Sequence, residues 1–143
     1  MDTFFGEYEY KVDSKGRLPL PPKFRQKLRD GLVLTRGAET CVVIYPIDEW
    51  HKLADTLAAR TMTPSKMRRL NRIIFGEAFS LSLDGQGRIP LPPSLRRYAK
   101  ISDISIIVGA NNCVELWDPD MWNAEKDSAQ EQVWQIIESL EVQ

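Results

Sequence analysis

The sequence has no long apolar run, and this absence excludes several classes of protein at once. Among its 143 residues no apolar stretch approaches the roughly 18 residues that a membrane-spanning helix requires. Residues 1–7 lack the basic start and the apolar segment of a signal peptide. We therefore expect no membrane partner, no export and a cytoplasmic location.

Cysteine and histidine are also scarce. Cys41 and Cys113 have neither the spacing of metal ligands nor the number that a disulfide framework needs. Free cysteine behaves as a small buried hydrophobic residue, so we expect both in the core. His51 has no second histidine or cysteine at ligand spacing. The sequence therefore predicts no metal site and no cofactor.

The net charge of −1 hides an uneven distribution. Residues 1–114 carry 18 Lys and Arg against 12 Asp and Glu, a net charge of +6. Residues 115–143 carry one Lys against eight acidic residues, a net charge of −7. A basic body with an acidic tail can indicate a polyanionic partner, although an acidic solvated helix would explain the tail equally well.

An internal repeat is the strongest feature of the sequence. Residues 13–25 align without a gap with residues 84–96, and eight of the thirteen positions are identical. Further matches lie on either side of this segment: Phe5-Gly6-Glu7 with Phe75-Gly76-Glu77, Gly37-Ala38 with Gly109-Ala110, Cys41 with Cys113, and Trp50 with Trp122. Two copies at a spacing of about seventy residues indicate a duplicated supersecondary unit rather than a solenoid.

Each copy predicts a strand, a tight turn, a second strand and a short helix. Strands are expected at 8–12 and 79–83, each followed directly by Asp-x-x-Gly. Asp at the first position of a type I turn accepts a backbone N–H, and Gly supplies the positive φ of the following bulge. Pro19 and Pro90 cannot donate to a strand ladder, so the strands after the turns should be short or at an edge. Pro21-Pro22 and Pro92-Pro93 then open helices that should run to about Leu28 and Ala99.

The remaining segments complete an α+β fold. Strands are expected at 32–35, 41–45, 104–108 and 113–117, and helices from Ile47, from Pro64 to Gly76 and from Pro119. In the helix after Pro64, Arg68 and Arg72 share one face and should be solvated or contact another subunit. The four tryptophans should serve the core or an interface. Because one copy of about fifty residues would bury little core alone, we expect the two copies to pack about a pseudo-twofold axis.

These motifs resemble the MraZ family of bacterial transcriptional regulators. The resemblance rests on Phe-Gly-Glu-Tyr, on Asp-x-Lys-Gly-Arg-Leu-x-Leu-Pro-x-Lys-Phe-Arg, on Tyr-Pro-x-x-Glu-Trp, and on Asp-x-x-Gly-Arg-Ile with Glu-Leu-Trp in the second half. It covers essentially the whole chain. It implies two pseudo-symmetric AbrB-like hairpin motifs that form one swapped-hairpin barrel within the chain, with flanking helices. This sequence departs from the pattern at Pro22, and Gln86 stands where the first copy has Lys15.

The resemblance also implies a division of the chain and a function. The first AbrB-like DNA-binding motif would span 7–49, linking helices 50–77, the second motif 78–121 and an acidic C-terminal helix 122–143. The chain would form ring-like homo-oligomers that bind double-stranded DNA at short repeated promoter boxes of the cell-division and cell-wall gene cluster, in association with the nucleoid. The expected DNA-binding residues are Lys15, Arg17 and Arg88, with Asp13 and Asp84 orienting the arginines.

Each of these residues has an alternative interpretation. Arg17 and Arg88 could simply pair with Asp13 and Asp84 and stabilise the turns, a role that is compatible with facing DNA. Asp13 and Asp84 could instead form an acid/base pair of an enzyme, but an arginine after each carboxylate should keep it ionised. A third alternative is an oligomeric scaffold that binds protein and not DNA. Arg25 and Arg96, which are also matched, could form salt bridges or contact the backbone and are assigned no role.

Overall fold

The computed structural model describes residues 3–142 and contains eight strands, five α-helices and one π-helix within them. The strands are β1 (Glu7–Lys11), β2 (Arg17–Pro19), β3 (Leu32–Arg36), β4 (Val42–Pro46), β5 (Phe79–Leu81), β6 (Arg88–Pro90), β7 (Ile104–Gly109) and β8 (Val114–Trp117). The helices are α1 (Pro22–Arg25), α2 (Ile47–Ala58), α3 (Pro64–Leu70), the π-helix η1 (Asn71–Phe75), α4 (Pro93–Ala99) and α5 (Pro119–Val142).

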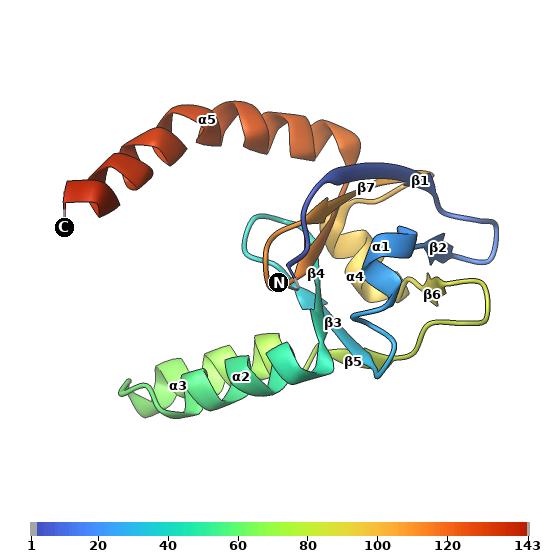
Figure 1. Cartoon of the computed structure of the whole chain (residues 1–143). Coiled ribbons are helices and arrows are strands. Elements are labelled where there is room, and N and C mark those ends of the chain that lie inside the picture. The colour runs from blue at the N-terminus through green and yellow to red at the C-terminus, as the bar shows by residue number, and fades with distance from the viewer. Residues whose placement is uncertain (1–2, 143) are drawn as a thin grey trace.

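The order of elements repeats the duplication in the sequence. The first copy runs β1-β2-α1-β3-β4-α2 and the second runs β5-β6-α4-β7-β8-α5, with α3 and η1 between them. Figure 1 shows α1 and α4 beside the strands, α2 and α3 on one side of the molecule, and α5 extending from the other side. The mixed α+β class predicted from the repeat is confirmed.

The two copies exchange their first strands. In the six-stranded sheet, of order β1-β7-β8-β4-β3-β5, β1 of the first copy pairs with β7 of the second, and β5 of the second pairs with β3 of the first. The central pair, β4 with β8, also joins the copies, with Val43 opposite Glu115. All these pairings are antiparallel. The strand order is therefore symmetric about the β4–β8 contact, as a pseudo-twofold arrangement requires.

The expected closed barrel is not present in the hydrogen-bonded ladders of residues 3–142. The six-stranded sheet ends at β1 and at β5, and β2 and β6 form a separate two-stranded sheet. Each of these two strands has only three residues, and Pro19 and Pro90 stand in them without a backbone N–H. The prediction that the proline strands would be short is confirmed, and the missing donors limit further pairing.

A single core fills the space between the two copies. Four residues in or just after β2 and α1 are buried, and so are the residues 71 positions later in the second copy. The matched pairs are Leu18 with Ile89, Leu20 with Leu91, Phe24 with Leu95, and Leu28 with Ala99. A smaller cluster on the other face of the sheet contains Cys41, Val43 and Trp117. Because this core is built from apolar side chains of both copies, one copy alone would bury too little apolar surface to fold stably.

Several boundaries differ from those the sequence predicts. Helix α1 ends at Arg25 rather than near Leu28, and the chain continues in turns in which the Leu28 N–H donates to the Arg25 carbonyl. β5 ends at Leu81 and not at Leu83. α3 continues as a π-helix to Phe75, with the Gly76 N–H donating to the Asn71 carbonyl. Propensity patterns locate such elements but fix their ends poorly, because the last turn depends on tertiary packing.

Candidate nucleic-acid interface

The first Asp-x-x-x-Arg turn is closed by the carboxylate of Asp13. Its Oδ1 atom accepts hydrogen bonds from the backbone N–H groups of Lys15 and Arg17, both at 2.9 Å. Its Oδ2 atom accepts one from Arg17 Nε at 2.8 Å. The Gly16 N–H donates to the Asp13 carbonyl at 3.0 Å, and Gly16 has a φ of 76°. A side chain would strain this left-handed backbone, which explains the glycine.

The second turn repeats this geometry. Asp84 Oδ1 accepts from the backbone N–H groups of Gln86 and Arg88 at 2.9 Å, and Oδ2 accepts from Arg88 Nε at 2.8 Å. Gly87 has a φ of 74°. Two copies with the same contacts at the same distances show that the turn is specified locally by Asp, Gly and Arg at this spacing.

Hydrogen bonding keeps both turn carboxylates ionised. Donation from the backbone N–H of Arg17 is the main cause that lowers the pKa of Asp13, and the backbone N–H of Arg88 does the same for Asp84. Bonds from the arginine side chains lower both values further. An acid/base pair needs one member that holds a proton near neutral pH. Both carboxylates here are instead stabilised as anions, which is unfavourable for the enzymatic alternative.

Pairing between the copies brings the two turns side by side. In the β2–β6 sheet, Leu18 lies opposite Ile89. Just beyond it, the Leu20 N–H donates to the Gly87 carbonyl at 3.0 Å, and the Leu91 N–H donates to the Gly16 carbonyl at 2.8 Å. Each turn is therefore fastened by the strand of the other copy. Figure 1 shows both turns projecting together at one end of the molecule.

Comparison with known proteins identifies the family to which the chain is related by sequence. The sequence model of the family described as "MraZ protein, putative antitoxin-like" matches the chain twice, over residues 3–73 and 74–138. The two matches together cover nearly the whole chain and divide it between the two copies. The chain belongs to the MraZ family.

Curated relatives in the MraZ family cover almost the full length. A protein of Dehalococcoides mccartyi is 54% identical over 139 residues, which are 96% of this chain and 98% of the relative. A protein of Herpetosiphon aurantiacus is 45% identical over 87% of each chain, and one of Halothermothrix orenii is 40% identical over 96% of each. All three relatives carry the name transcriptional regulator MraZ, which is not the name of an enzyme.

In this MraZ-family chain, the basic residues expected at the site lie together at the turns. Lys15 is exposed at the tip of the first turn. The side chains of Arg17 and Arg88 retain 34% and 23% exposure, and each uses its Nε atom to hold its own aspartate. Arg88 Nη1 also lies 3.9 Å from Asp13 Oδ2, so the ion pairs of the two turns touch. An arginine bound through Nε can still present its Nη groups to another acceptor.

Arg25 is a residue of this region to which sequence reasoning gave no role. Its Nε atom donates to the Leu20 carbonyl at 2.8 Å, and its guanidinium lies so close to Gly87 that a Cβ atom there would overlap it. Arg25 therefore links α1 of the first copy to the turn of the second. The match of Arg25 with Arg96 in the repeat is the sequence signal that could have indicated a role, but a repeat cannot show which copy each arginine contacts.

The other expectations concern residues away from the turns. Cys41 is buried as expected and Cys113 is half-buried, and burial raises the pKa of these thiols to about 12 and about 11. Thiols with such values are poor nucleophiles at neutral pH. Within residues 3–142 no helix combines the length and the apolar character needed to cross a membrane.

Proposed function

We propose that this chain is a transcription regulator that binds double-stranded DNA sequence-specifically through its two Asp-x-x-x-Arg turns. The observation that supports this most directly is the adjacent pair of turns, which share their Asp–Arg contacts and project from one end of the molecule (Figure 1). The names of the relatives support the regulatory role. In this proposal the exchanged strands make a swapped-hairpin unit of the AbrB type, which presents the turns as a rigid pair.

Lys15, Arg17 and Arg88 are the proposed DNA-binding residues. A guanidinium held by a carboxylate has a defined direction, and such a group suits a phosphate or the edge of a guanine. Asp13 and Asp84 would orient the arginines and would not touch DNA, because a carboxylate repels phosphate. The proposed functional division follows the copies, with DNA-binding motifs at 7–49 and 78–121, linking helices at 50–77 and the C-terminal helix at 122–143.

The C-terminal half of α5 supports a second part of the proposal, namely self-association. Five large apolar side chains of this segment are 39% to 67% exposed: Val133, Trp134, Ile136, Ile137 and Leu140. At 100° per residue they fall on one side of the helix. An exposed apolar face of this size on a charged helix is typical of an interaction site.

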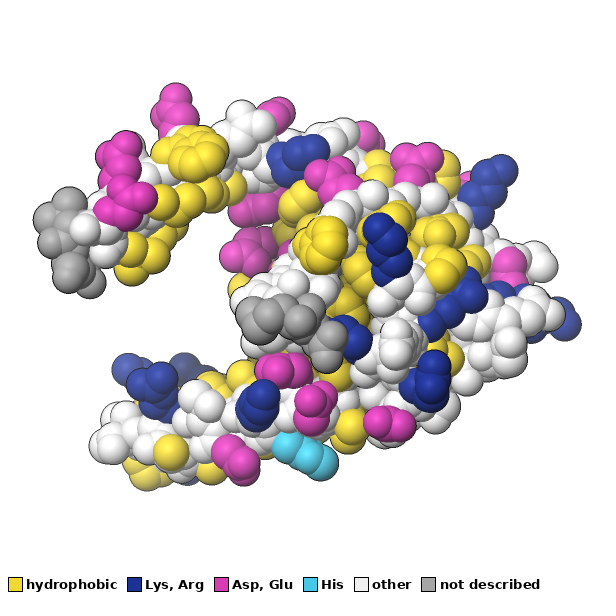
Figure 2. All heavy atoms as spheres, in the orientation of Figure 1, with side chains coloured by type: hydrophobic (Ala, Val, Ile, Leu, Met, Phe, Trp, Pro, Cys, Tyr) yellow, Lys and Arg dark blue, Asp and Glu magenta, His cyan; other side chains and the backbone are white. Residues whose placement is uncertain are grey.

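The matching surface lies on α2 and α3. A cleft of about 380 Å³ between these helices and the sheet has apolar walls that include Leu53, Leu57, Leu70 and Ile74. The same helices, α3 and η1, also carry four exposed basic residues: Lys66, Arg68, Arg69 and Arg72. Figure 2 shows the hydrophobic side of α5 and the basic side chains near α3 facing the same open space.

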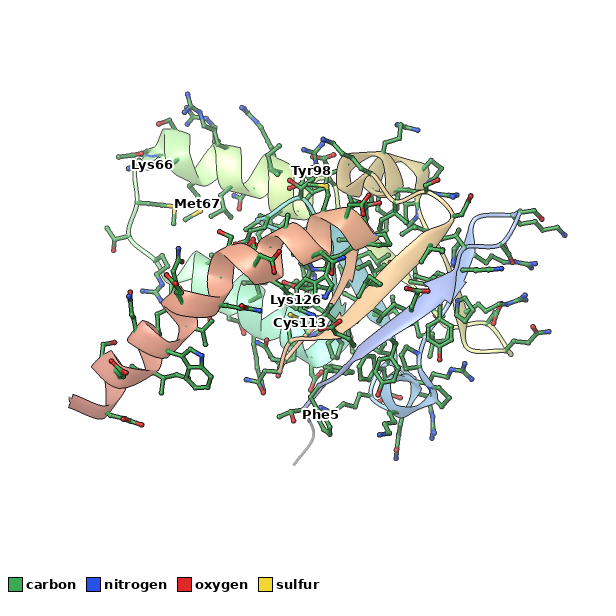
Figure 3. All side chains as sticks on the ribbon, turned by 90° about the horizontal axis from the view of Figure 1, so that it is seen from above. Phe5, Lys66, Met67, Tyr98, Cys113 and Lys126 are labelled. Carbon is green, nitrogen blue, oxygen red and sulfur yellow. The ribbon has the colours of Figure 1, made fainter. Side chains whose placement is uncertain are left out.

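The occupant that fits this surface is α5 of a second copy. The segment carries Glu131, Glu138 and Glu141 beside its apolar face, and these charges complement those of α3. A contact between two different surfaces of one chain adds copies head to tail and closes into a ring when the rotation allows. Lys66 on α3 lies at the opposite end of the molecule from the two turns (Figure 3), so assembly leaves the turns free for DNA.

A regulator of this kind would act as a ring-like homo-oligomer on short repeated promoter boxes, like those of the cell-division and cell-wall gene cluster, in the nucleoid of the cytoplasm. A mobility-shift assay with the DNA upstream of its own gene tests this. Several boxes at native spacing should bind far more tightly than one box, because neighbouring subunits gain effective concentration. Shifting one box by half a helical turn should remove most of that gain. Equal affinity for one box and for several would show that each subunit binds alone.

A further inference from the structure

The second turn borders a cleft. The cleft measures about 480 Å³ and lies between the second turn and the segment that begins with α1. Arg25 and Arg29 border it on one side, and Asp84, Gly85 and Gly87 border it on the other. The walls thus come from both copies, so the site exists only because the copies interdigitate.

The cleft has an excess of positive charge. The carboxylate of Asp84 already accepts three hydrogen bonds, two from Arg88 and one from Gln86, so its charge is compensated within the turn. Arg25 is held by its Nε atom on the Leu20 carbonyl. Arg29 is exposed and forms no ion pair with any residue in 3–142. Two guanidinium groups therefore border the cleft with no anion of the chain assigned to them.

The corresponding region beside the first turn is built differently. Arg96, the counterpart of Arg25, donates to the carbonyls of Ile101 at 3.0 Å and Ser102 at 2.6 Å. Its Nη1 atom lies 3.8 Å from the position that a Cβ would take on Gly16, at ordinary contact distance. Lys100, the counterpart of Arg29, has a left-handed backbone with a φ of 58° at the end of α4. The pseudo-symmetry of the turns does not extend to the arginines behind them.

The charge at the tips of the turns also differs, and here the first turn has the additional cation. The first turn carries Lys15 at its tip, and the second carries the neutral Gln86 at the same place. A phosphate close to the first turn has a tip lysine available. A phosphate close to the second turn has none from its own tip, but Arg25 and Arg29 of the first copy border the cleft beside that turn.

We propose that this cleft binds a backbone phosphate of DNA through Arg25 and Arg29, and that the second turn depends on these residues of the first copy where the first turn uses its own Lys15. The inference rests on the proposed function, since the phosphate belongs to DNA held by the turns. Arg29 supplies an exposed cation, and Arg25 supplies a guanidinium held against Gly87.

Fluorescence anisotropy with a labelled duplex of the upstream boxes, over a series of salt concentrations, tests the proposal. Arg29→Ala should weaken binding about threefold to tenfold and reduce the magnitude of the slope of log K against log salt by about 0.9 for each occupied cleft. Arg29→Lys, which keeps the charge, should keep the slope. The matched control is Lys100→Ala, which removes one charge at the equivalent place beside the first turn and should have a markedly smaller effect. Thermal melting should show all three variants folded, because both residues are exposed.

Gln86→Lys in the Arg29→Ala background provides the decisive arm. A lysine at the second tip should restore most of the lost affinity and slope, because it would supply the cation that the first turn already has. Unchanged binding by Arg29→Ala, or an equal loss with Lys100→Ala, would overturn the cleft as a phosphate site. If Arg17→Ala weakens binding strongly while Arg29→Ala leaves both the affinity and the salt slope unchanged, only this inference fails. If the unsubstituted protein does not bind the duplex, the proposed function fails with it.

Discussion

Substituting alanine for the glycine of each turn should destabilise the protein unequally. Gly16 and Gly87 both have a φ near 75°, and a left-handed backbone costs a residue with a side chain about 1–2 kcal/mol. Next to Gly16, a new Cβ would meet only Arg96 Nη1 at 3.8 Å. Next to Gly87, it would overlap Arg25 and push that side chain from the Leu20 carbonyl.

The difference between the two variants measures the contact of Arg25 with the second turn. Loss of one hydrogen bond costs about 0.5–1.5 kcal/mol. Gly16→Ala should therefore lower the free energy of unfolding by about 1–2 kcal/mol, and Gly87→Ala by about 1.5–3.5 kcal/mol. Urea titrations of both proteins, compared at equal subunit concentration, give these values.

A double-mutant cycle excludes a difference in backbone strain as the cause. In an Arg25→Ala background, Gly87→Ala should cost no more than Gly16→Ala does in the unsubstituted protein. If Gly16→Ala is as destabilising as Gly87→Ala, or if the excess survives removal of Arg25, the guanidinium does not rest on the second turn. Arg25 would then not form a fixed wall of the cleft.

Two further outcomes are expected. Trp134→Ser should leave the subunit folded but dissociate the oligomer, because the side chain is 67% exposed and touches no core; light scattering that shows the same mass for both proteins would contradict the α5 contact. Because the folded-state pKa values of Asp13 and Asp84 are lowered, these groups contribute stability above their unfolded pKa of about 4, which is lost as the pH falls through the folded values. Asp13→Asn with Asp84→Asn should therefore reduce the fall in the free energy of unfolding on acidification, as measured by urea titrations between about pH 5 and pH 3. An unchanged fall would contradict this role of the two carboxylates.

The sequence predicts most of the local structure because the motifs that carry it are local. Asp13 and Asp84 close their turns with bonds to residues two and four positions later, so the repeat alone predicts both turns. The order of strands and helices follows from periodicity and from proline and glycine in the same way. The buried residues Leu18 and Ile89 also occupy matched positions in the two copies.

What the sequence does not predict depends on contacts between the copies. A barrel closed by strand pairing was expected, but Pro19 and Pro90 leave β2 and β6 as a separate sheet. The position of Arg25 against Gly87 was not predicted, because the repeat does not show which copy each arginine contacts. The contact results from the exchange of strands between the copies, and no pattern within one copy encodes it.

The most direct test of the central claim measures DNA binding after both turn arginines are removed. Each arginine contact to a base or phosphate contributes about 1–3 kcal/mol, so Arg17→Ala with Arg88→Ala should weaken binding to the upstream boxes at least about thirtyfold. As a control, Arg60→Ala removes an exposed arginine beyond the end of α2, and this variant should bind DNA like the unsubstituted protein. Thermal melting should show both proteins folded, and light scattering should show both with the oligomer mass of the unsubstituted protein. Unchanged DNA affinity of the folded double variant would contradict the account, because the two arginines would then only stabilise the turns and would not contact DNA.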